Sequence, residues 1–157
     1  MSVILLDANA IIAHGRGFPD RAKAAAERGE RLVLPQSVKR ELVDDVLKKD
    51  DAPENHRGSA RAIEQVIEEE HVRVREPDFD RFGESIDQAR RRIADDSLPE
   101  HEIKADQYIP ALVCELAQNE DVIVVTGDRK LGNTIEDIAD KHNLAHEVSI
   151  RDPRSVL

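Results

Sequence analysis

Two short apolar runs, Val3–Leu6 and Val122–Val125, are each followed closely by an aspartate. Runs of this length that are rich in Val, Ile and Leu are typical of strands buried on both faces, as in parallel sheets covered by helices. In such folds ligands bind beyond the carboxyl ends of the strands. Asp7 and Asp128 come just after those ends, so we expect residues far apart in the chain to share one acidic pocket.

Strand-like and helix-like segments alternate along the whole chain. Further strands are predicted at Arg31–Leu34, Val72–Val74 and Ala145–Ile150. Alternation of this kind predicts right-handed βαβ crossovers and an α/β fold with a mainly parallel sheet. Helices are predicted at 9–14, 21–28, 38–49, 60–70, 79–94, 131–142 and in a segment ending near 119, with Asp20 and Ser37 as caps and loops at 50–58 and 95–99.

The length of 157 residues suits one domain, 1–157, with a real core. No apolar run approaches the roughly 18 residues that span a bilayer. The N-terminus shows no secretory leader, so we expect a soluble cytoplasmic protein. The single cysteine, Cys114, lies in an apolar helical stretch and is expected to be a buried, inert thiol.

The chain is strongly acidic, with 33 Asp and Glu against 23 Lys and Arg and a net charge of −10. Arginine outnumbers lysine, and this composition resembles that of proteins from salt-loving organisms. A charge of this size repels polyanions in dilute buffer. At molar salt the Debye length falls to about 3 Å, so the charge does not exclude a nucleic-acid substrate.

Two more acids are expected at the same sheet edge. Glu41 lies in the first turns of the helix predicted after Arg31–Leu34, and Asp106 lies at the start of the helix that returns to Val122–Val125. Helices of βα units begin near the carboxyl end of the preceding strand, so both acids can face the strand-end crevice. The topology therefore predicts that four carboxylates from four distant segments converge.

Crowded carboxylates cannot all stay ionised unless a cation neutralises them. Hard divalent cations with oxygen ligands suit such a cluster, which makes Mg²⁺ or Mn²⁺ the expected occupant. Zinc is disfavoured by the lone cysteine and the scattered histidines. A metal of this kind can activate water and stabilise charge on a phosphoryl oxygen, as phosphodiester hydrolysis requires.

Four segments in this order resemble the motifs of the PIN-domain nucleases. Leu5–Ile12 resembles the opening motif of the family, Val38–Leu42 its second acidic helix, and Val124–Asp128 the strand and acid that close its site. Asp106, with apolar residues behind it, resembles the third acid. The resemblance covers nearly the whole chain.

The resemblance implies a three-layer α/β/α sandwich with five strands and a metal-dependent endoribonuclease activity on single-stranded or looped RNA. It implies a toxin of a toxin–antitoxin pair or an RNA-processing enzyme, with an antitoxin or processing protein as partner, and it makes a homodimer plausible. Residues 51–100 would contact substrate or partner. The implied metal ligands are Asp7, Glu41, Asp106 and Asp128, and the implied orienting residues are Asn9 and Thr126.

Several simpler or different interpretations stay open. An acid after a strand is often only a helix N-cap. Pro110 requires the helix near Asp106 to start there or to kink, so Asp106 is either a ligand or a cap, with Glu102 as its substitute. Arg90–Arg92, with Arg57 and Arg61, form either an RNA-phosphate patch or a solvated face that balances nearby acids.

Two other functions compete with the nuclease. One is a non-catalytic PIN-fold module that binds RNA or protein. The other is a phosphatase of the haloacid-dehalogenase type, which also opens on an apolar strand and an aspartate. The motif of that class has a second aspartate two residues after the first, where this chain has Asn9.

Overall fold

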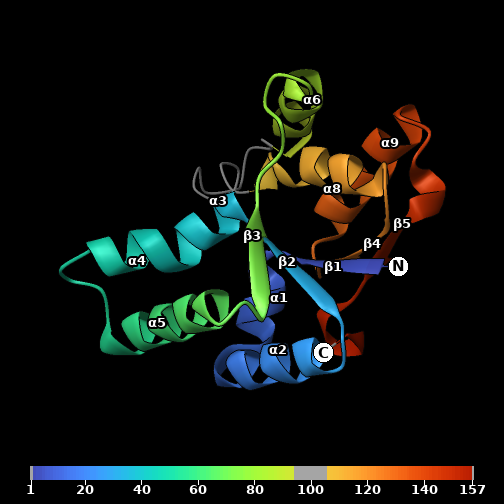
Figure 1. Cartoon of the computed structure of the whole chain (residues 1–157). Coiled ribbons are helices and arrows are strands. Elements are labelled where there is room, and N and C mark those ends of the chain that lie inside the picture. Colours follow the sequence, from blue (N-terminus) through green and yellow to red (C-terminus); the bar gives the residue numbers. More distant parts are fainter. Residues whose placement is uncertain (1, 94–105, 157) are drawn as a thin grey trace.

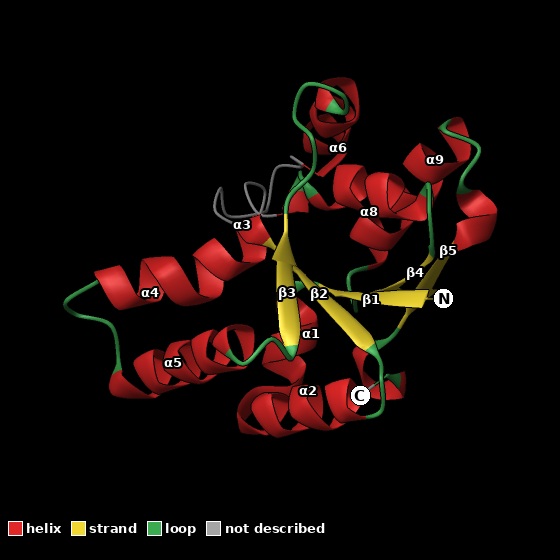
Figure 2. Cartoon of the chain, viewed as in Figure 1, coloured by secondary structure: helices red, strands yellow, loops and turns green. Residues whose placement is uncertain are grey.

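The computed structural model describes residues 2–93 and 106–156, and its centre is a sheet of five parallel strands in the order β3-β2-β1-β4-β5 (Figures 1 and 2). This confirms the predicted α/β fold with a parallel sheet. The strands are β1 (Ser2–Leu6), β2 (Arg31–Pro35), β3 (Val72–Arg75), β4 (Asp121–Val125) and β5 (Val148–Arg151).

Helices cover both faces of the sheet, which gives the three layers (Figure 2). On one side lie α1 (Ala8–His14), α2 (Phe18–Glu27) and α5 (Glu54–Glu68), and on the other α6 (Gly83–Ile93), α8 (Ile109–Ala117) and α9 (Arg129–Lys141). After β2 the chain forms α3 (Gln36–Lys39), the π-helical turn η2 (Arg40–Asp44) and α4 (Asp45–Lys48). The 3₁₀ turns are η1 (Gly15–Gly17), η3 (Ala145–Glu147) and η4 (Pro153–Ser155).

The register brings all carboxyl ends of the strands to one edge. The last paired residues are Leu6 with Val125, Pro35 with Arg75, and Val125 with Arg151. The chain winds from β1 through β2 to β3 in one direction, whereas β4 and β5 lie on the other side of β1. The order therefore reverses between β1 and β4, and such a switch point is where open α/β sheets bind ligands.

The core consists mainly of aliphatic side chains from both faces of the sheet. Helix α8 is buried at almost every position, as expected for a helix that is apolar on all sides. Cys114 lies in α8 with no exposed surface, and burial raises the pKa of its thiol to about 11, so it is protonated near neutral pH. Across residues 2–93 and 106–156, no helix has the length and apolarity that a bilayer crossing requires.

Helix starts differ most from the sequence predictions. Helix α2 begins at Phe18 rather than after Asp20, because Pro19 fits the first turn of a helix. Helix α3 begins at Gln36 after Pro35, so Ser37 is not its cap. Pro110 likewise lies in the first turn of α8, where its missing N–H costs nothing.

Three other boundaries also shift. Helix α5 begins at Glu54, which shortens the loop predicted at 50–58, and α6 begins at Gly83 rather than at Phe79. The last strand begins only at Val148, because residues 145–147 form η3. The loop predicted at 95–99 lies outside the described residues.

Candidate active site

Asp7 follows β1 at the switch point and is only 2% exposed. It is the N-cap of α1, and its Oδ1 accepts a hydrogen bond from the Ala10 N–H at 2.7 Å. Its Oδ2 accepts a hydrogen bond of 2.5 Å from the Thr126 hydroxyl. A carboxylate is thus fixed in a buried position by the first turn of α1 and by the residue that follows β4.

Thr126 connects Asp7 to the second acid. While its hydroxyl donates to Asp7, its Oγ1 accepts a hydrogen bond of 3.0 Å from the Asp128 N–H. The Thr126 N–H donates to the Arg151 carbonyl at 3.0 Å, which holds this residue against the end of β5. Asp128 caps α9, and its Oδ1 accepts from the Leu131 N–H at 3.1 Å. One buried hydroxyl therefore contacts the Asp7 carboxylate and the Asp128 backbone.

The electrostatics of Asp7 favour a bound cation. Burial raises its pKa above the ordinary value, and the negative charge of Asp128 raises it further. Hydrogen bonds from the Thr126 hydroxyl and from the N–H groups of Ala10 and Asn9 oppose this shift. A divalent cation held by Asp7 and Asp128 would stabilise the charged form of Asp7 and offset the cost of its burial.

Capping does not exclude metal binding at these two aspartates. A carboxylate offers about four lone-pair sites. The protein donors to Asp7 are the Thr126 hydroxyl and the Ala10 and Asn9 amides, which leaves acceptor capacity on its oxygens. Both Asp7 and Asp128 are therefore helix caps, as the simpler interpretation predicted, and both retain the chemistry of metal ligands.

Glu41 and Asp106 lie on segments that start at the same sheet edge. Glu41 is half-buried within η2, and π-helical turns of this kind occur frequently at functional sites. Asp106 is half-buried and precedes the turn at 107–108; the N-cap of α8 is Tyr108, so Asp106 does not cap that helix.

Within residues 2–93 and 106–156, no three His, Cys, Asp or Glu side chains form a group that could hold a metal ion. The structure brings Asp7 and Asp128 together through Thr126. The convergence of Glu41 and Asp106 with them stays a prediction. Glu102, the proposed substitute for Asp106, lies outside the described residues. Asn9 is exposed, one residue beyond the start of α1.

The predicted arginine patch is wrong as a single surface. Helix α5 carries Arg57 and Arg61, and α6 carries Arg90–Arg92, but these helices cover opposite faces of the sheet (Figure 1). Arg61 pairs with Glu54 at 3.1 Å, and Arg92 with Asp137 at 2.6 Å. The alternative that these arginines balance nearby acids therefore fits Arg61 and Arg92.

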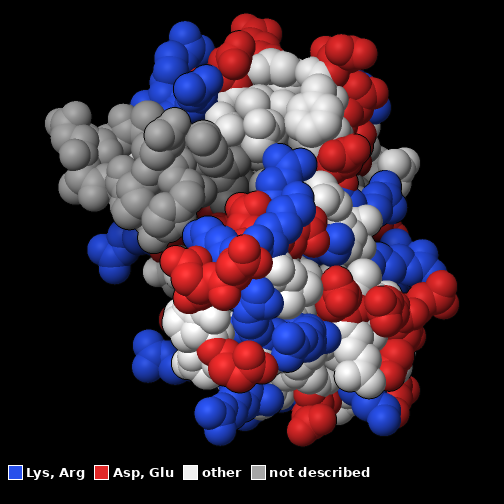
Figure 3. All heavy atoms as spheres, turned by 90° about the vertical axis from the view of Figure 1, so that its left-hand side faces the viewer, with Lys and Arg blue, Asp and Glu red and all other residues white. Residues whose placement is uncertain are grey.

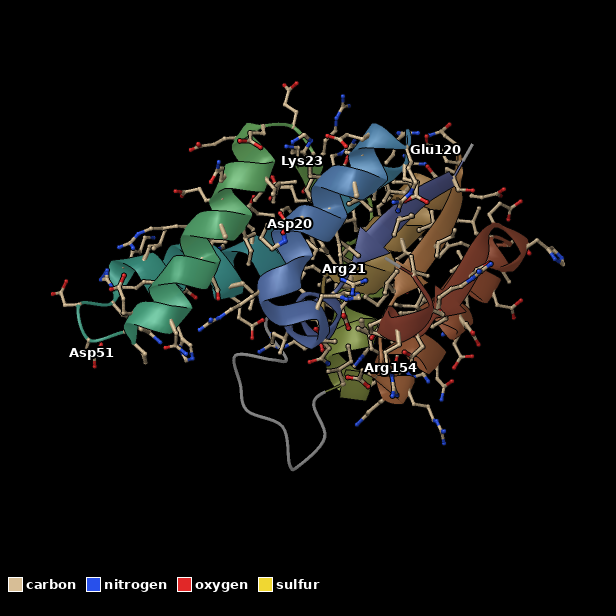
Figure 4. All side chains as sticks on the ribbon, turned by 90° about the horizontal axis from the view of Figure 1, so that it is seen from below. Asp20, Arg21, Lys23, Asp51, Glu120 and Arg154 are labelled. Atoms are coloured by element: carbon tan, nitrogen blue, oxygen red, sulfur yellow. The ribbon has the colours of Figure 1, made fainter. Side chains whose placement is uncertain are left out.

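Charges of both signs are interleaved on the outer faces. Figure 3 shows this for the side that carries α4 and α5. Seen from below, α2 carries Asp20, Arg21 and Lys23 close together (Figure 4). The face in Figure 3 carries no broad patch of Lys and Arg among the described residues.

A large apolar hollow in the described part of the chain contains none of the four candidate acids. It is an apolar groove of about 650 Å³ between α1 and α2 on one side and η2, α4 and α5 on the other. The exposed Ile12 side chain lies in its lining. A second, smaller hollow lies where β2 and β3 end, and its arginine and aromatic residues were missed from the sequence. The position of Arg75 directly at the end of a predicted strand was the signal that could have found them.

Comparison with known proteins identifies the fold family. A family model described as "Halobacterial PIN domain" matches residues 1–157. The chain belongs to this family. The match confirms the PIN resemblance and excludes the haloacid-dehalogenase alternative. It also agrees with the acidic composition, which resembles that of proteins from salt-loving organisms.

A solved structure supports the same fold for this PIN domain. The structure titled VapBC-1 from nontypeable Haemophilus influenzae is similar with a TM-score of 0.53 and 19% identity, over 98% of this chain and 99% of that chain. At this identity the likeness shows the fold alone. No curated protein matches the chain at a significant level.

Proposed function

We propose that this PIN domain is a metal-dependent endoribonuclease that hydrolyses RNA phosphodiester bonds with Mg²⁺ or Mn²⁺. The observation that carries the proposal is the buried Asp7 carboxylate, held beside Asp128 by Thr126 at the switch point of the sheet. A buried carboxylate next to a second, half-buried one calls for a cation, and hard oxygen ligands favour these two metals. Family membership makes nuclease chemistry the natural use of such a site.

The proposed division of roles follows the local geometry. Asp7 and Asp128 would hold the metal together with Glu41 and Asp106, and the bound metal would supply activated water and charge stabilisation at phosphorus. Thr126 would keep the two aspartates in one orientation. The exposed Asn9 side chain, close to Asp7 in sequence, would orient the RNA.

We also propose that the chain acts as one domain under the control of a partner protein. A toxin regulated by an antitoxin and an RNA-processing subunit both fit, and the solved neighbour named VapBC-1 motivates the first. A homodimer is compatible with either role. Residues 51–100 would contribute substrate or partner contacts.

The decisive experiment compares cleavage of a mixed RNA pool by wild type and Asp7→Asn at high KCl with added Mn²⁺. Asp51→Asn is the matched control, because Asp51 is exposed in the turn between α4 and α5 (Figure 4). We expect wild type and Asp51→Asn to cut, and Asp7→Asn and all EDTA samples not to cut.

Equal cutting by all three proteins would contradict the site. Cutting by none of them would favour the non-catalytic RNA- or protein-binding module. That alternative keeps the same fold and acids but uses them, as helix caps, only for stability.

A further inference from the structure

A shallow hollow of about 60 Å³ lies where β2 and β3 end. Its lining combines two aromatic rings with two arginines, and the segments that supply them are far apart in the chain. The residues that matter here are Arg40, Arg75, Glu76, Phe79 and Tyr108. Aromatic and arginine side chains together are the usual means by which proteins bind unpaired nucleotides.

Phe79 presents its ring to solvent although it is large and apolar. Its side chain is 49% exposed, and in the part of the chain that the structure describes only Ile12, at 61%, is a comparably exposed large hydrophobic. The Phe79 ring meets the Tyr108 ring edge-to-face, with centroids 5.6 Å apart and planes at 87°. Tyr108 packs against the core, so it supports Phe79 from behind.

The two arginines are exposed and make no hydrogen bond or ion pair with other described residues. In this they differ from Arg31, which pairs with Glu120, and from Arg61, which pairs with Glu54. The guanidinium groups of Arg40 and Arg75 are thus available for an anion from outside. Glu76 is the acid among the lining residues that opposes it.

The hollow lies at the same edge as the candidate active site. Pro35 pairs with Arg75 across β2 and β3, and Pro35 lies level with Asp7 when the β1–β2 register is continued. Adjacent strands are about 4.8 Å apart, so the backbones of Arg75 and Asp7 are separated by about 10 Å. An RNA strand that enters the acidic site can therefore pass over the hollow.

We propose that this hollow binds an unstacked nucleotide of single-stranded RNA, with the base lying on Phe79 and the flanking phosphates on Arg40 and Arg75. The inference rests on the proposed ribonuclease function and adds a nucleotide-binding site beside the acidic one. The hollow is too shallow to enclose a base, so the base lies across the exposed ring. In a duplex the faces of the bases are covered by stacking, so single strands are preferred.

The test measures binding rather than cleavage, in EDTA, with a fluorescent single-stranded RNA oligonucleotide and its duplex, by anisotropy at several KCl concentrations. Stacking of one base contributes about 1–3 kcal/mol, so Phe79→Ala is expected to weaken binding about 5- to 150-fold at every salt concentration. Phe79→Trp is expected to retain binding. Ile12→Ala, which removes a similarly exposed apolar side chain elsewhere, is the matched control and should bind normally.

The arginine changes are expected to act differently from the aromatic change. Arg75→Gln or Arg40→Gln removes one phosphate contact and lowers the slope of log affinity against log salt by about 0.7. Glu76→Gln is expected to tighten binding, because it removes the opposing charge. Near-ultraviolet circular dichroism of each variant shows that the fold is intact.

Three outcomes would each overturn this inference. Phe79→Ala could bind as well as wild type, wild type could bind single strands and duplex equally, or wild type could bind no RNA. The nuclease proposal is judged separately by the Asp7→Asn cleavage comparison. Cutting that depends on Asp7, together with binding that ignores Phe79, would leave the ribonuclease standing and remove the nucleotide site. Binding that depends on Phe79 in a chain that never cuts would do the reverse.

Discussion

Metal binding at Asp7 and Asp128 should appear as thermal stabilisation that Asp7→Asn abolishes. A ligand that binds only the folded state at 100 times its dissociation constant stabilises it by about 2.7 kcal/mol. Unfolding entropy near 2.1 cal/mol/K per residue gives about 0.33 kcal/mol/K for 157 residues. Saturating Mn²⁺ is therefore expected to raise the melting temperature of wild type by about 8 °C.

Without metal, Asp7→Asn should be more stable than wild type at neutral pH. Burial raises the pKa of Asp7. At a pH above that raised pKa the folded protein carries a buried negative charge, whereas in the unfolded chain the same charge is hydrated, so folding is less favourable. This cost is relieved as pH falls through the raised value, and it is absent below the unfolded pKa of about 3.9. Metal-free Asp7→Asn is expected to melt above metal-free wild type at neutral pH, with the two converging in acid.

The asparagine can keep the local hydrogen bonds. Its carbonyl can accept from the Ala10 N–H, and its amide can donate to Thr126 Oγ1, which has two acceptor lone pairs. The substitution therefore removes the charge and keeps these two contacts, while the Thr126 hydroxyl proton loses Asp7 Oδ2 as its acceptor. Any loss of metal response then reports on the carboxylate itself.

The assay is differential scanning fluorimetry at constant high KCl, with Mn²⁺ titrated against EDTA, for wild type, Asp7→Asn and Asp51→Asn. Asp51→Asn controls for weak metal binding to a surface with many acids, because Asp51 lies exposed outside the site. Wild type and Asp51→Asn should gain the same shift. The reasoning is refuted if Asp7→Asn gains that shift too, or if metal-free Asp7→Asn melts below wild type at neutral pH.

Three further predictions follow from the same contacts. Thr126→Val leaves the Asp7 Oδ2 and the Asp128 N–H without their partner and is expected to cost about 1–3 kcal/mol in urea unfolding and to abolish cleavage, whereas Thr126→Ser should retain both. Mn²⁺ affinity measured by calorimetry should fall on acidification at a pH above that of an ordinary aspartate, because protons compete for Asp7 with its raised pKa. Leu112→Ala opens a cavity in the fully buried α8 and is expected to lower the melting temperature by about 6–15 °C, from a cost of about 2–5 kcal/mol; an unchanged melting temperature would show that α8 is not core.

The sequence predicted the sheet and the two strand-end acids because each depends on strong local signals. Apolar runs that are buried on both faces differ from everything around them, and an aspartate directly after such a run is fixed to the sheet edge. Helix starts were predicted less well. Proline supplies the first turns of α2 and α8, and α3 begins after Pro35 with no side-chain cap, so the polar residues that suggested later starts are not caps.

Contacts between distant segments were beyond reach of the sequence. Phe79 fits helical spacing with Phe82, yet it precedes α6. Its ring contacts Tyr108, which is distant in the sequence. Only the structure shows that Arg75 and Arg40, separated by more than a helix, border one hollow. The same distance limits the four-acid prediction, of which the Asp7–Asp128 pair is the part with direct structural support.

The combination of an exposed aromatic ring and two exposed arginines suits RNA binding by a strongly acidic protein. At high salt the overall negative charge is screened within about 3 Å, but the gain from phosphate contacts also falls because counterion release contributes less. Base stacking does not depend on released counterions, so the exposed Phe79 ring retains its contribution when the arginines lose theirs. Affinity at molar salt should therefore depend more on Phe79 than on Arg40 or Arg75, and the contribution of the two arginines should grow as the salt concentration falls.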